Sequence, residues 1–217
     1  MSGNGPDERA GAAADGAGGW PVDLTGVTET VVTTLGPNGL WNAAALGVFT
    51  GDEDGDSDSG AASKPPTATA KTWGNTRTRR NFRRQGEGYV QFVDDPVTFV
   101  DAALSISEHE APVLESAAAW TRVAVESIDR GTENGTEWVA WRLRPLESAI
   151  ERETVPTINR GFGAVVEATV AASRLGVVGY DDDQLRERLA YCESVVERAG
   201  GPRERAALER VRECADW

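Results

Sequence analysis

The alternation of hydrophobic and polar positions divides the chain into a first part rich in strands and a last part rich in helices. The run VTETVVTTL is β-branched and partly alternating, and the run LWNAAALGVF follows it after Gly36-Pro37-Asn38-Gly39. Asn-Gly between two such runs is a strong hairpin signal. Similar short apolar runs predict further strands. The predicted strands cover residues 27–35, 40–49, 67–73, 89–93, 118–129 and 136–146.

Two short helices are predicted between these strands. Residues 75–85 have a helix-like pattern that ends at two glycines, and Asp94-Asp95-Pro96 begins a short helix over 96–104 with proline in its first turn. Residues 130–135 are rich in turn formers and are expected to link the last two strands. This spacing of elements predicts a mainly β fold with some α, a small six-stranded antiparallel barrel rather than alternating βαβ units.

The last third of the chain has apolar residues at helical spacing. One helix is predicted from Asn159 to just before Gly176, a second over 182–201, and a third over 202–217, which starts with proline and carries Glu/Arg pairs. Three C-terminal helices therefore follow the β domain. The predicted organisation is a disordered tail over 1–24, a barrel domain over 25–150 with a flexible acidic insert at 51–66, and a helical region over 151–217.

The charge balance restricts the classes of partner. Lys and Arg number 22 against 35 Asp and Glu, which gives a net charge of −13, and only Lys64 and Lys71 are lysines. Nucleic acids and anionic membranes attract a basic face, so neither is an expected partner. No run approaches the ~20 apolar residues of a membrane span, and no signal-peptide pattern opens the sequence. We therefore expect a cytoplasmic protein of a halophilic, salt-adapted cell.

The few cysteine and histidine residues disfavour metal chemistry. Cys192 and Cys214 are the only cysteines, without a CxxC pattern, and His109 is the only histidine. The insert 51–66 has five acids in its first eight residues and resembles an EF-hand calcium loop in that respect. It lacks the glutamate at the twelfth position and the flanking helices. An enzyme of this composition would take its chemistry from an organic cofactor.

Residues 71–86, KTWGNTRTRRNFRRQG, are the most informative segment. Six of the 22 basic residues fall within it, and no acid occurs between Asp58 and Glu87. A helix N-terminus with free N–H groups, hydroxyls and arginine suits a phosphomonoester, and Trp73 offers an aromatic face beside it. A solvated basic helix face is the alternative interpretation. An RNA-binding surface is a third, disfavoured by the surrounding negative charge.

Several blocks of sequence resemble the FMN-binding split-barrel flavoproteins, and more narrowly the archaeal family called domain of unknown function 447. The blocks are LWNAAALGVF, KTWGNTRTRRNF and GEGYVQFVDDPVTFVDAAL. The wider flavin-reductase-like group has Thr-x-x-Asn followed by Gly-Glu-x-x-Val, and here Thr78-Arg79-Arg80-Asn81 precedes Gly86-Glu87-Gly88-Tyr89-Val90. The segment 158–175 is also similar to the narrow family, so the likeness spans roughly residues 25–175.

The resemblance implies a homodimeric split barrel with FMN at the subunit interface. It implies that the phosphate lies at the turn between strand and helix and that the isoalloxazine lies along the second strand, where small residues let backbone N–H groups reach the flavin N5/O4 edge. The implied phosphate-binding residues are Asn75, Thr76, Arg77, Thr78 and Asn81. The implied isoalloxazine-binding residues are Asn42, Ala43, Ala44 and Ala45, whose small size would otherwise serve only the curvature of the barrel.

Other conspicuous residues have simpler interpretations. Arg160 would reach the flavin or substrate of a partner subunit, or it belongs to a capped helix that only packs. His109, in SEHEAP, is expected to be an exposed loop residue rather than a general acid. Trp120, Trp138 and Trp141 are expected in the core or the dimer interface rather than stacked on a substrate.

The function implied by the resemblance is that of an FMN-dependent oxidoreductase of the flavin-reductase or flavoredoxin type. FMN would receive a hydride from a nicotinamide, or electrons from a ferredoxin-like donor, and pass them to an undetermined acceptor. No residue resembles a proton donor dedicated to one substrate. Two alternatives remain open: a non-catalytic protein that stores, senses or delivers flavin, and a dimeric scaffold that has lost its flavin.

Overall fold

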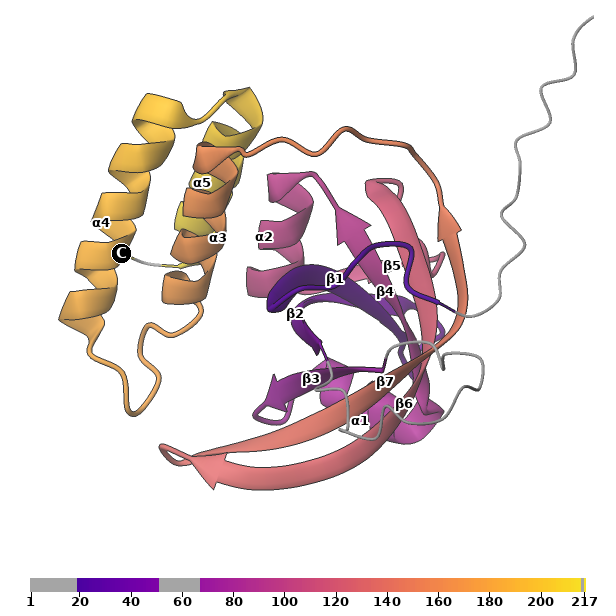
Figure 1. Ribbon diagram of the computed structural model, residues 1–217. Coiled ribbons are helices and arrows are strands. Elements are labelled where there is room, and N and C mark those ends of the chain that lie inside the picture. The colour runs from indigo at the N-terminus through magenta and orange to yellow at the C-terminus, as the bar shows by residue number, and fades with distance from the viewer. Residues whose placement is uncertain (1–18, 51–66, 216) are drawn as a thin grey trace, which may run out of the picture.

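The computed structural model describes residues 19–50, 67–215 and 217 (Figure 1). The predicted acidic insert and most of the predicted tail therefore lie outside the described residues. The strands are β1 Val27–Leu35, β2 Trp41–Thr50, β3 Ala68–Trp73, β4 Glu87–Val93, β5 Ser107–His109, β6 Ala117–Glu133 and β7 Thr136–Ile150. The helices are α1 Arg77–Gln85, α2 Pro96–Leu104, α3 Arg160–Ala172, α4 Asp182–Ala199 and α5 Pro202–Cys214.

Six strands close an antiparallel barrel, which confirms the predicted fold class. Their order is β1-β4-β6-β7-β3-β2, and pairing of β2 with β1 completes the ring, while the short β5 adds to the first residues of β2. The predicted Asn-Gly turn joins β1 to β2, since the Gly36 N–H donates to the Leu40 carbonyl at 2.7 Å and Gly39 has a φ of +80°. Glycine takes this left-handed conformation without strain.

Alternate residues of each strand fill the interior of the barrel. Trp141 is 2% exposed; its indole N–H donates to the Thr72 hydroxyl at 2.9 Å, and its ring meets the edge of Phe82 from α1. The helix α1 thus supplies an apolar side chain to the core, which fixes its position against the barrel. Trp141 confirms the prediction of a core tryptophan. The buried residues of this core are Val32, Leu46, Val48, Ala68, Ala70, Phe82, Val90, Val123, Val139, Trp141 and Leu143.

The hairpin of β6 and β7 is longer than predicted. The expected linker 130–135 is wrong, because β6 continues to Glu133 and only Asn134-Gly135 forms the turn. Both turn residues have positive φ, 49° and 79°, as in a tight two-residue hairpin turn. Most residues of β6 beyond Val125 are exposed, so the inside–outside alternation that marks a barrel strand is absent there.

Two further differences concern segments expected to be irregular. His109 is partly buried in β5 rather than in an exposed loop, and its Nε2 lies 2.8 Å from the Ser107 hydroxyl. Residues 19–24 belong to the predicted tail, yet Trp20 and Leu24 pack against the barrel core. Trp20 meets the ring of Phe92 edge to face. Short apolar contacts of this kind give no periodic signal in the sequence.

The three predicted C-terminal helices are confirmed and pack beside α2 (Figure 1). Asn159 caps α3 by accepting the Phe162 N–H at 3.1 Å, and its amide donates to Glu204 on α5 at 2.7 Å. The capped packing helix is therefore present, and Arg160 at its start is exposed. The helix α2 joins the two parts of the molecule, because Val100 packs among the C-terminal helices and Phe99 packs against Val31 and Ala43 of the barrel.

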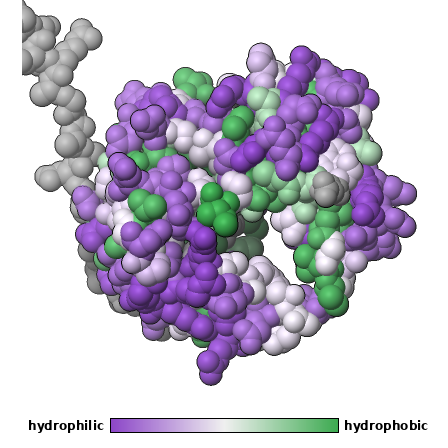
Figure 2. All heavy atoms as spheres, turned by 180° about the vertical axis from the view of Figure 1, so that it is seen from behind, coloured by the Kyte–Doolittle hydropathy of each residue, from purple (hydrophilic) through white to green (hydrophobic). Residues whose placement is uncertain are grey.

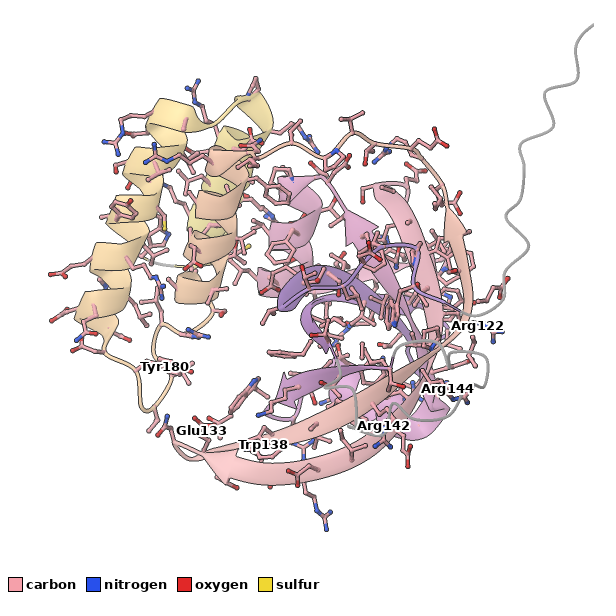
Figure 3. All side chains as sticks on the ribbon, in the orientation of Figure 1. Arg122, Glu133, Trp138, Arg142, Arg144 and Tyr180 are labelled. Carbon is pink, nitrogen blue, oxygen red and sulfur yellow. The ribbon has the colours of Figure 1, made fainter. Side chains whose placement is uncertain are left out.

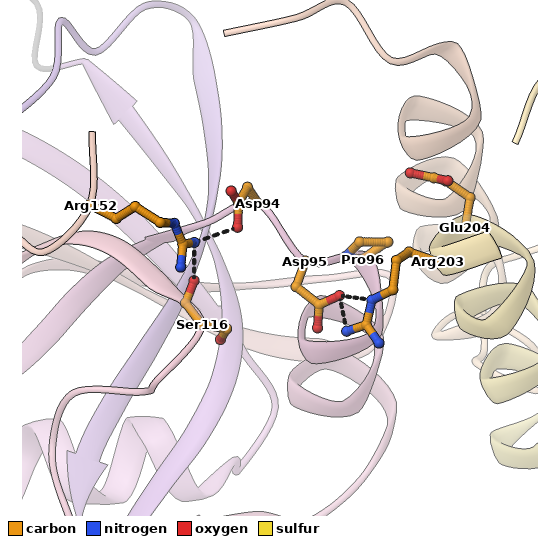
Figure 4. A pocket seen from close by; sticks show the side chains of 7 residues that line it. All are labelled: Asp94, Asp95, Pro96, Ser116, Arg152, Arg203 and Glu204. Atoms are coloured by element: carbon orange, nitrogen blue, oxygen red, sulfur yellow. Dashed lines mark hydrogen bonds and ion pairs between the residues drawn. The ribbon is translucent and has the colours of Figure 1, made fainter. Parts of the chain in front are cut away.

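Ion pairs hold the barrel to the helical region at a shallow polar pocket (Figure 4). Arg152 donates to Asp94 at 2.8 Å, and Arg203 on α5 pairs with Asp95, the N-cap of α2. Burial alone would raise the pKa of the Asp95 carboxyl, but hydrogen bonds from Thr98 and Arg203 outweigh it and hold that pKa below its ordinary value. The charged form of Asp95 thus stabilises the folded chain.

This contribution of Asp95 predicts a pH-dependent stability. Because the pKa is lower in the folded chain, the stabilisation is present above the unfolded value of about 3.9 and is lost as the pH falls through the folded value. Asp95→Asn keeps an N-capping side chain but removes the charge. We expect the free energy of unfolding in urea to differ between wild type and variant at pH 7, and the difference to shrink at pH 3. A difference that stays constant over this range would contradict the prediction.

The tip of the β6–β7 hairpin reaches the loop between α3 and α4. A Cβ atom placed on Gly179 would lie 2.7 Å from the Asn134 Cβ, so the two segments touch. Seen from behind, the molecule is hollowed by an opening (Figure 2). Trp138 on β7 and Tyr180 in the loop lie on the two sides of the space between hairpin and helices (Figure 3). The contact at the hairpin tip closes this space on one side.

Candidate functional site

The N-terminus of α1 lies directly after β3, as predicted, and presents free backbone donors. Thr76 is the N-cap, and its hydroxyl accepts the Arg79 N–H at 3.2 Å. The N–H groups of Arg77 and Thr78 have no hydrogen-bond partner within the described part of the chain. Unpaired N–H groups and the helix dipole favour an anion at such a terminus.

Two arginines hold the turn before α1 in place. Arg79 is 7% exposed and donates to the Gly74 carbonyl and to Glu137 on β7, both at 3.0 Å. Arg80 donates to the Asn75 carbonyl at 2.6 Å. These bonds occupy carbonyl oxygens of the turn, so that the turn itself offers donors rather than acceptors to a ligand. The Arg79 Nε is buried without a hydrogen-bond partner in the described structure, while the charge of the guanidinium is paired with Glu137.

Arg77 lies at the surface between α1 and β5. Its guanidinium donates to Glu108 at 2.7 Å, and the Asn38 amide donates to the same carboxylate oxygen at 3.2 Å. The Arg77 side chain is 41% exposed. An exposed pair of this kind contributes little to stability, so the guanidinium is able to turn to an anion bound at the helix N-terminus.

Thr78 and Asn81 are buried and fasten α1 to the barrel. Thr78 is 4% exposed and Asn81 is 3% exposed. The Asn81 amide donates to the Thr34 hydroxyl at 3.0 Å, and its oxygen accepts from Arg84 at 2.9 Å. Both side chains face the protein, so they position the helix, whereas Asn75, Thr76 and Arg77 lie at its outer end.

The strand β2 has one edge that is only partly paired. In an antiparallel strand, successive residues form backbone hydrogen bonds to the neighbouring strands on opposite sides. The backbone hydrogen bonds of Gly36 to Leu40 and of Thr50 to Gly26 show that the even-numbered residues of β2 bond to β1. On the other side β5 pairs with Trp41–Ala43 and β3 with Val48–Thr50. Along this second edge, no described strand pairs with residues 44–47, which pair only with β1. The N–H groups of Ala45 and Gly47 therefore face an open edge.

The small residues of β2 are divided between the two faces of the strand. Asn42 and Ala44 share the inward face with Leu46 and Val48, and Asn42 is 6% exposed. Ala43 and Ala45 face outward, where Ala43 packs against Phe99 of α2. The backbone of Ala43 pairs with β5. The structure thus does not bring Ala43 to the open edge, and it places Ala45 and Gly47, two to four residues later, at the position where a ligand would meet the backbone.

Two tryptophan side chains lie on the outer face of β3 and β7. Trp73 is 43% exposed and lies opposite Trp138 in the register of the two strands. The Lys71 ammonium lies 4.6 Å from the centre of the Trp138 ring, a cation–π contact. Trp138 is thus not a core residue, and it faces the space between hairpin and helices (Figure 3).

Sequence reasoning did not identify Gly47 or Glu137 as residues of this region, and it did not separate the buried Arg79 from the other arginines of its segment. Arg79 and Glu137 are 58 positions apart and meet only through the pairing of β3 with β7. Gly47 had a signal, as a glycine within a strand often marks close approach of another group. The described residues contain no group of three or more potential metal ligands, and none of their helices is long and apolar enough to cross a membrane.

A solved structure shares this fold, and others are similar to part of the chain. An FMN-bound DUF447-family protein, MM1853 from Methanosarcina mazei, is 24% identical, with a TM-score of 0.70 over 88% of this chain and 96% of that one. Nitrilotriacetate monooxygenase component B from Bacillus cereus is 15% identical, with a TM-score of 0.43 over 58% and 71%. Flavoredoxin from Methanosarcina acetivorans is 11% identical, with a TM-score of 0.42 over 63% and 78%.

The family assignment rests on both parts of the molecule. The N-terminal domain model of the protein of unknown function DUF447 matches residues 28–152, which contain the barrel. The C-terminal model matches residues 159–213, which contain α3, α4 and α5. The chain therefore belongs to the DUF447 family.

Proposed function

We propose that this protein binds FMN and acts as an FMN-dependent oxidoreductase. The observation that carries the proposal is the combination of two sets of unpaired N–H groups, those of Arg77 and Thr78 at α1 and those of Ala45 and Gly47 on β2. A phosphate suits the first set, and the carbonyl and ring nitrogen edge of an isoalloxazine suits the second. The FMN held by MM1853 supports the same choice of ligand.

The residues of the site fit the two ends of FMN. Asn75, Thr76 and Arg77 would hold the phosphate, on a turn that Arg79 and Arg80 hold in place. Ala45 and Gly47 would hold the ring edge, and Trp73 would cover part of the ligand. FMN, when bound, supplies two-electron and one-electron redox chemistry, which the protein tunes through hydrogen bonds and charge.

The partners and the catalytic role belong to the same proposal. We expect a homodimer, with a nicotinamide or a ferredoxin-like protein as electron donor. A non-catalytic flavin-binding protein is the second candidate, since no contact among the described side chains identifies a site for an electron donor. Stoichiometric FMN that neither NADH, NADPH nor reduced ferredoxin reduces would favour that candidate.

The first test is an absorbance spectrum of the purified protein in high salt, before and after addition of FMN and removal of the excess. We expect retained flavin absorbance, lost or weakened when Arg77 is replaced. Arg130→Ala, on the exposed part of β6, is the matched control and should retain FMN. A protein that retains no FMN would overturn the proposal.

A further inference from the structure

The outer face of α1 carries arginines that no acid of the described chain pairs with. This nine-residue helix contains five arginines and no acidic residue. Two of the arginines pair with acids of β5 and β7, as described above. Other arginines without an ion pair in the described chain, such as Arg130 and Arg160, are scattered over different elements. The remaining three of α1 are exposed and form a group that we call the basic face of α1: Arg80, Arg83 and Arg84.

The spacing of these three arginines places them on one side of the helix. Residues three and four positions apart are neighbours on a helix surface, so the like charges of Arg80, Arg83 and Arg84 repel one another. The helix dipole favours Arg83 and Arg84, which lie in the last turn, but not Arg80 near the N-terminus. The dipole therefore does not account for the whole group, and the repulsion would be relieved by an acidic partner.

Two of the three side chains are held in place by the protein. Arg80 donates to the Asn75 carbonyl at 2.6 Å, and Arg84 donates to the Asn81 side-chain oxygen at 2.9 Å. A guanidinium has five N–H donors, so both keep donors for a ligand. Arginine binds carboxylates with two parallel hydrogen bonds, and side chains that are already ordered lose little entropy on binding. The basic face is thus prepared to bind carboxylates.

The small size of the basic face favours an acidic protein over a nucleic acid. A helix of nine residues is about 14 Å long. Glu108 pairs with Arg77 at its N-terminal end, and Glu87 follows its C-terminal end, so acids bound the face on both sides. Duplex DNA carries one charge per about 1.7 Å and would extend over these acids. A compact cluster of carboxylates on a folded protein would not.

We propose that the basic face of α1 docks an acidic protein that delivers electrons to the bound flavin, an inference that rests on the proposed function. The N-terminus of the same helix is the proposed phosphate site, so a protein docked here lies beside the cofactor. The electron donor is then a protein with an acidic surface rather than a free nicotinamide. Two molecules of a one-electron donor are oxidised for each flavin that takes up two electrons, together with two protons from water.

The test measures reduction of the FMN-loaded protein by a reduced plant-type ferredoxin of net negative charge. Arg83→Glu reverses one charge of the basic face at a side chain without a hydrogen bond in the described structure, and Arg83→Lys keeps the charge. Arg198→Glu is the matched control, since Arg198 is exposed in the last turn of α4, on the opposite side of the molecule from α1 (Figure 1).

At about 0.15 M salt, the second-order rate constant is expected to fall about 10-fold in Arg83→Glu and to stay near the wild-type value in Arg83→Lys and Arg198→Glu. At about 1 M salt the difference should shrink to less than about 2-fold, because the Debye length shortens from about 8 Å to about 3 Å. Photoreduced 5-deazariboflavin, a neutral donor, should reduce all four proteins at equal rates. Circular dichroism at both salt concentrations checks that they stay folded.

Three results would overturn the docking role. They are equal ferredoxin rates in Arg83→Glu and Arg198→Glu, no reduction of the wild type by ferredoxin, and tighter binding of single-stranded oligouridylate than of oxidised ferredoxin to the basic face. The last result would identify a nucleic-acid surface. In each case retained FMN leaves the flavin binding of the proposed function standing, whereas a wild type that retains no FMN would overturn both proposals.

Discussion

Replacing Arg77 by proline is expected to weaken FMN binding by about 100-fold, and replacing it by alanine by about 10-fold. Alanine removes the guanidinium but keeps the backbone N–H, whereas proline removes both. Each charge-assisted hydrogen bond to a phosphate contributes about 1.5–3 kcal/mol, and about 1.4 kcal/mol corresponds to a tenfold change in affinity. The difference between the two variants therefore measures the contribution of the helix N-terminus alone.

Proline is compatible with the fold at this position. Arg77 is the first residue of α1, where proline is favoured because its missing N–H has no partner within the helix. Thr76 has φ −72° and ψ 163°, the extended conformation that a residue before proline adopts. Titration of flavin fluorescence gives the two dissociation constants, and far-UV circular dichroism checks that α1 stays folded. Equal affinities of the alanine and proline variants would show that the phosphate does not bind at this N-terminus.

The sequence predicted the elements of the site better than its contacts. The alternation of VTETVVTTL and the turn Gly36–Gly39 were enough to define the first hairpin, because both signals are local. The segment 71–86 was likewise identified as a strand followed by a helix N-terminus. Its charge excess stood out only against the acidic background of the whole chain.

The open edge of β2 could not be predicted, because it depends on which strands pair beyond the first hairpin. The isoalloxazine was expected along residues 42–45 on the ground of their small size. Because β5 pairs with Trp41–Ala43, the N–H groups left unpaired on this edge are those of Ala45 and Gly47. The strand β5 has only three residues, too few for a periodic signal.

The composition of the basic segment also does not show which of its arginines are buried and which are exposed. Arg79 is buried and donates to the Gly74 carbonyl, whereas Arg83, about one turn later in the same helix, is exposed. The sequence predicted a linker over the outer part of β6. A strand exposed on both faces has no alternation of hydrophobic and polar residues from which it could be predicted.

Replacement by alanine is expected to have opposite effects on stability at two glycines of α3. A Cβ on Gly161 would lie 2.6 Å from the Gly200 Cα and 3.2 Å from the Ala199 carbonyl, and these are backbone atoms that cannot rotate away. Gly161→Ala should therefore destabilise the protein by about 1–3 kcal/mol, as overpacking does. Nothing lies within 4 Å of a Cβ on Gly163, so Gly163→Ala should stabilise by about 0.5–1 kcal/mol through helix propensity.

The same pair of variants tests whether barrel and helical region unfold together. The helix α2 contributes Phe99 to the contacts with the barrel and Val100 to those with α3, α4 and α5, so separating α3 from Gly200 also loosens α2. We expect a single transition, seen alike by circular dichroism of the helices and by tryptophan fluorescence of the barrel. For a chain of this size each kcal/mol shifts Tm by about 2–4 °C. A transition lowered only in the helical signal of Gly161→Ala would show instead that the C-terminal helices fold independently of the barrel.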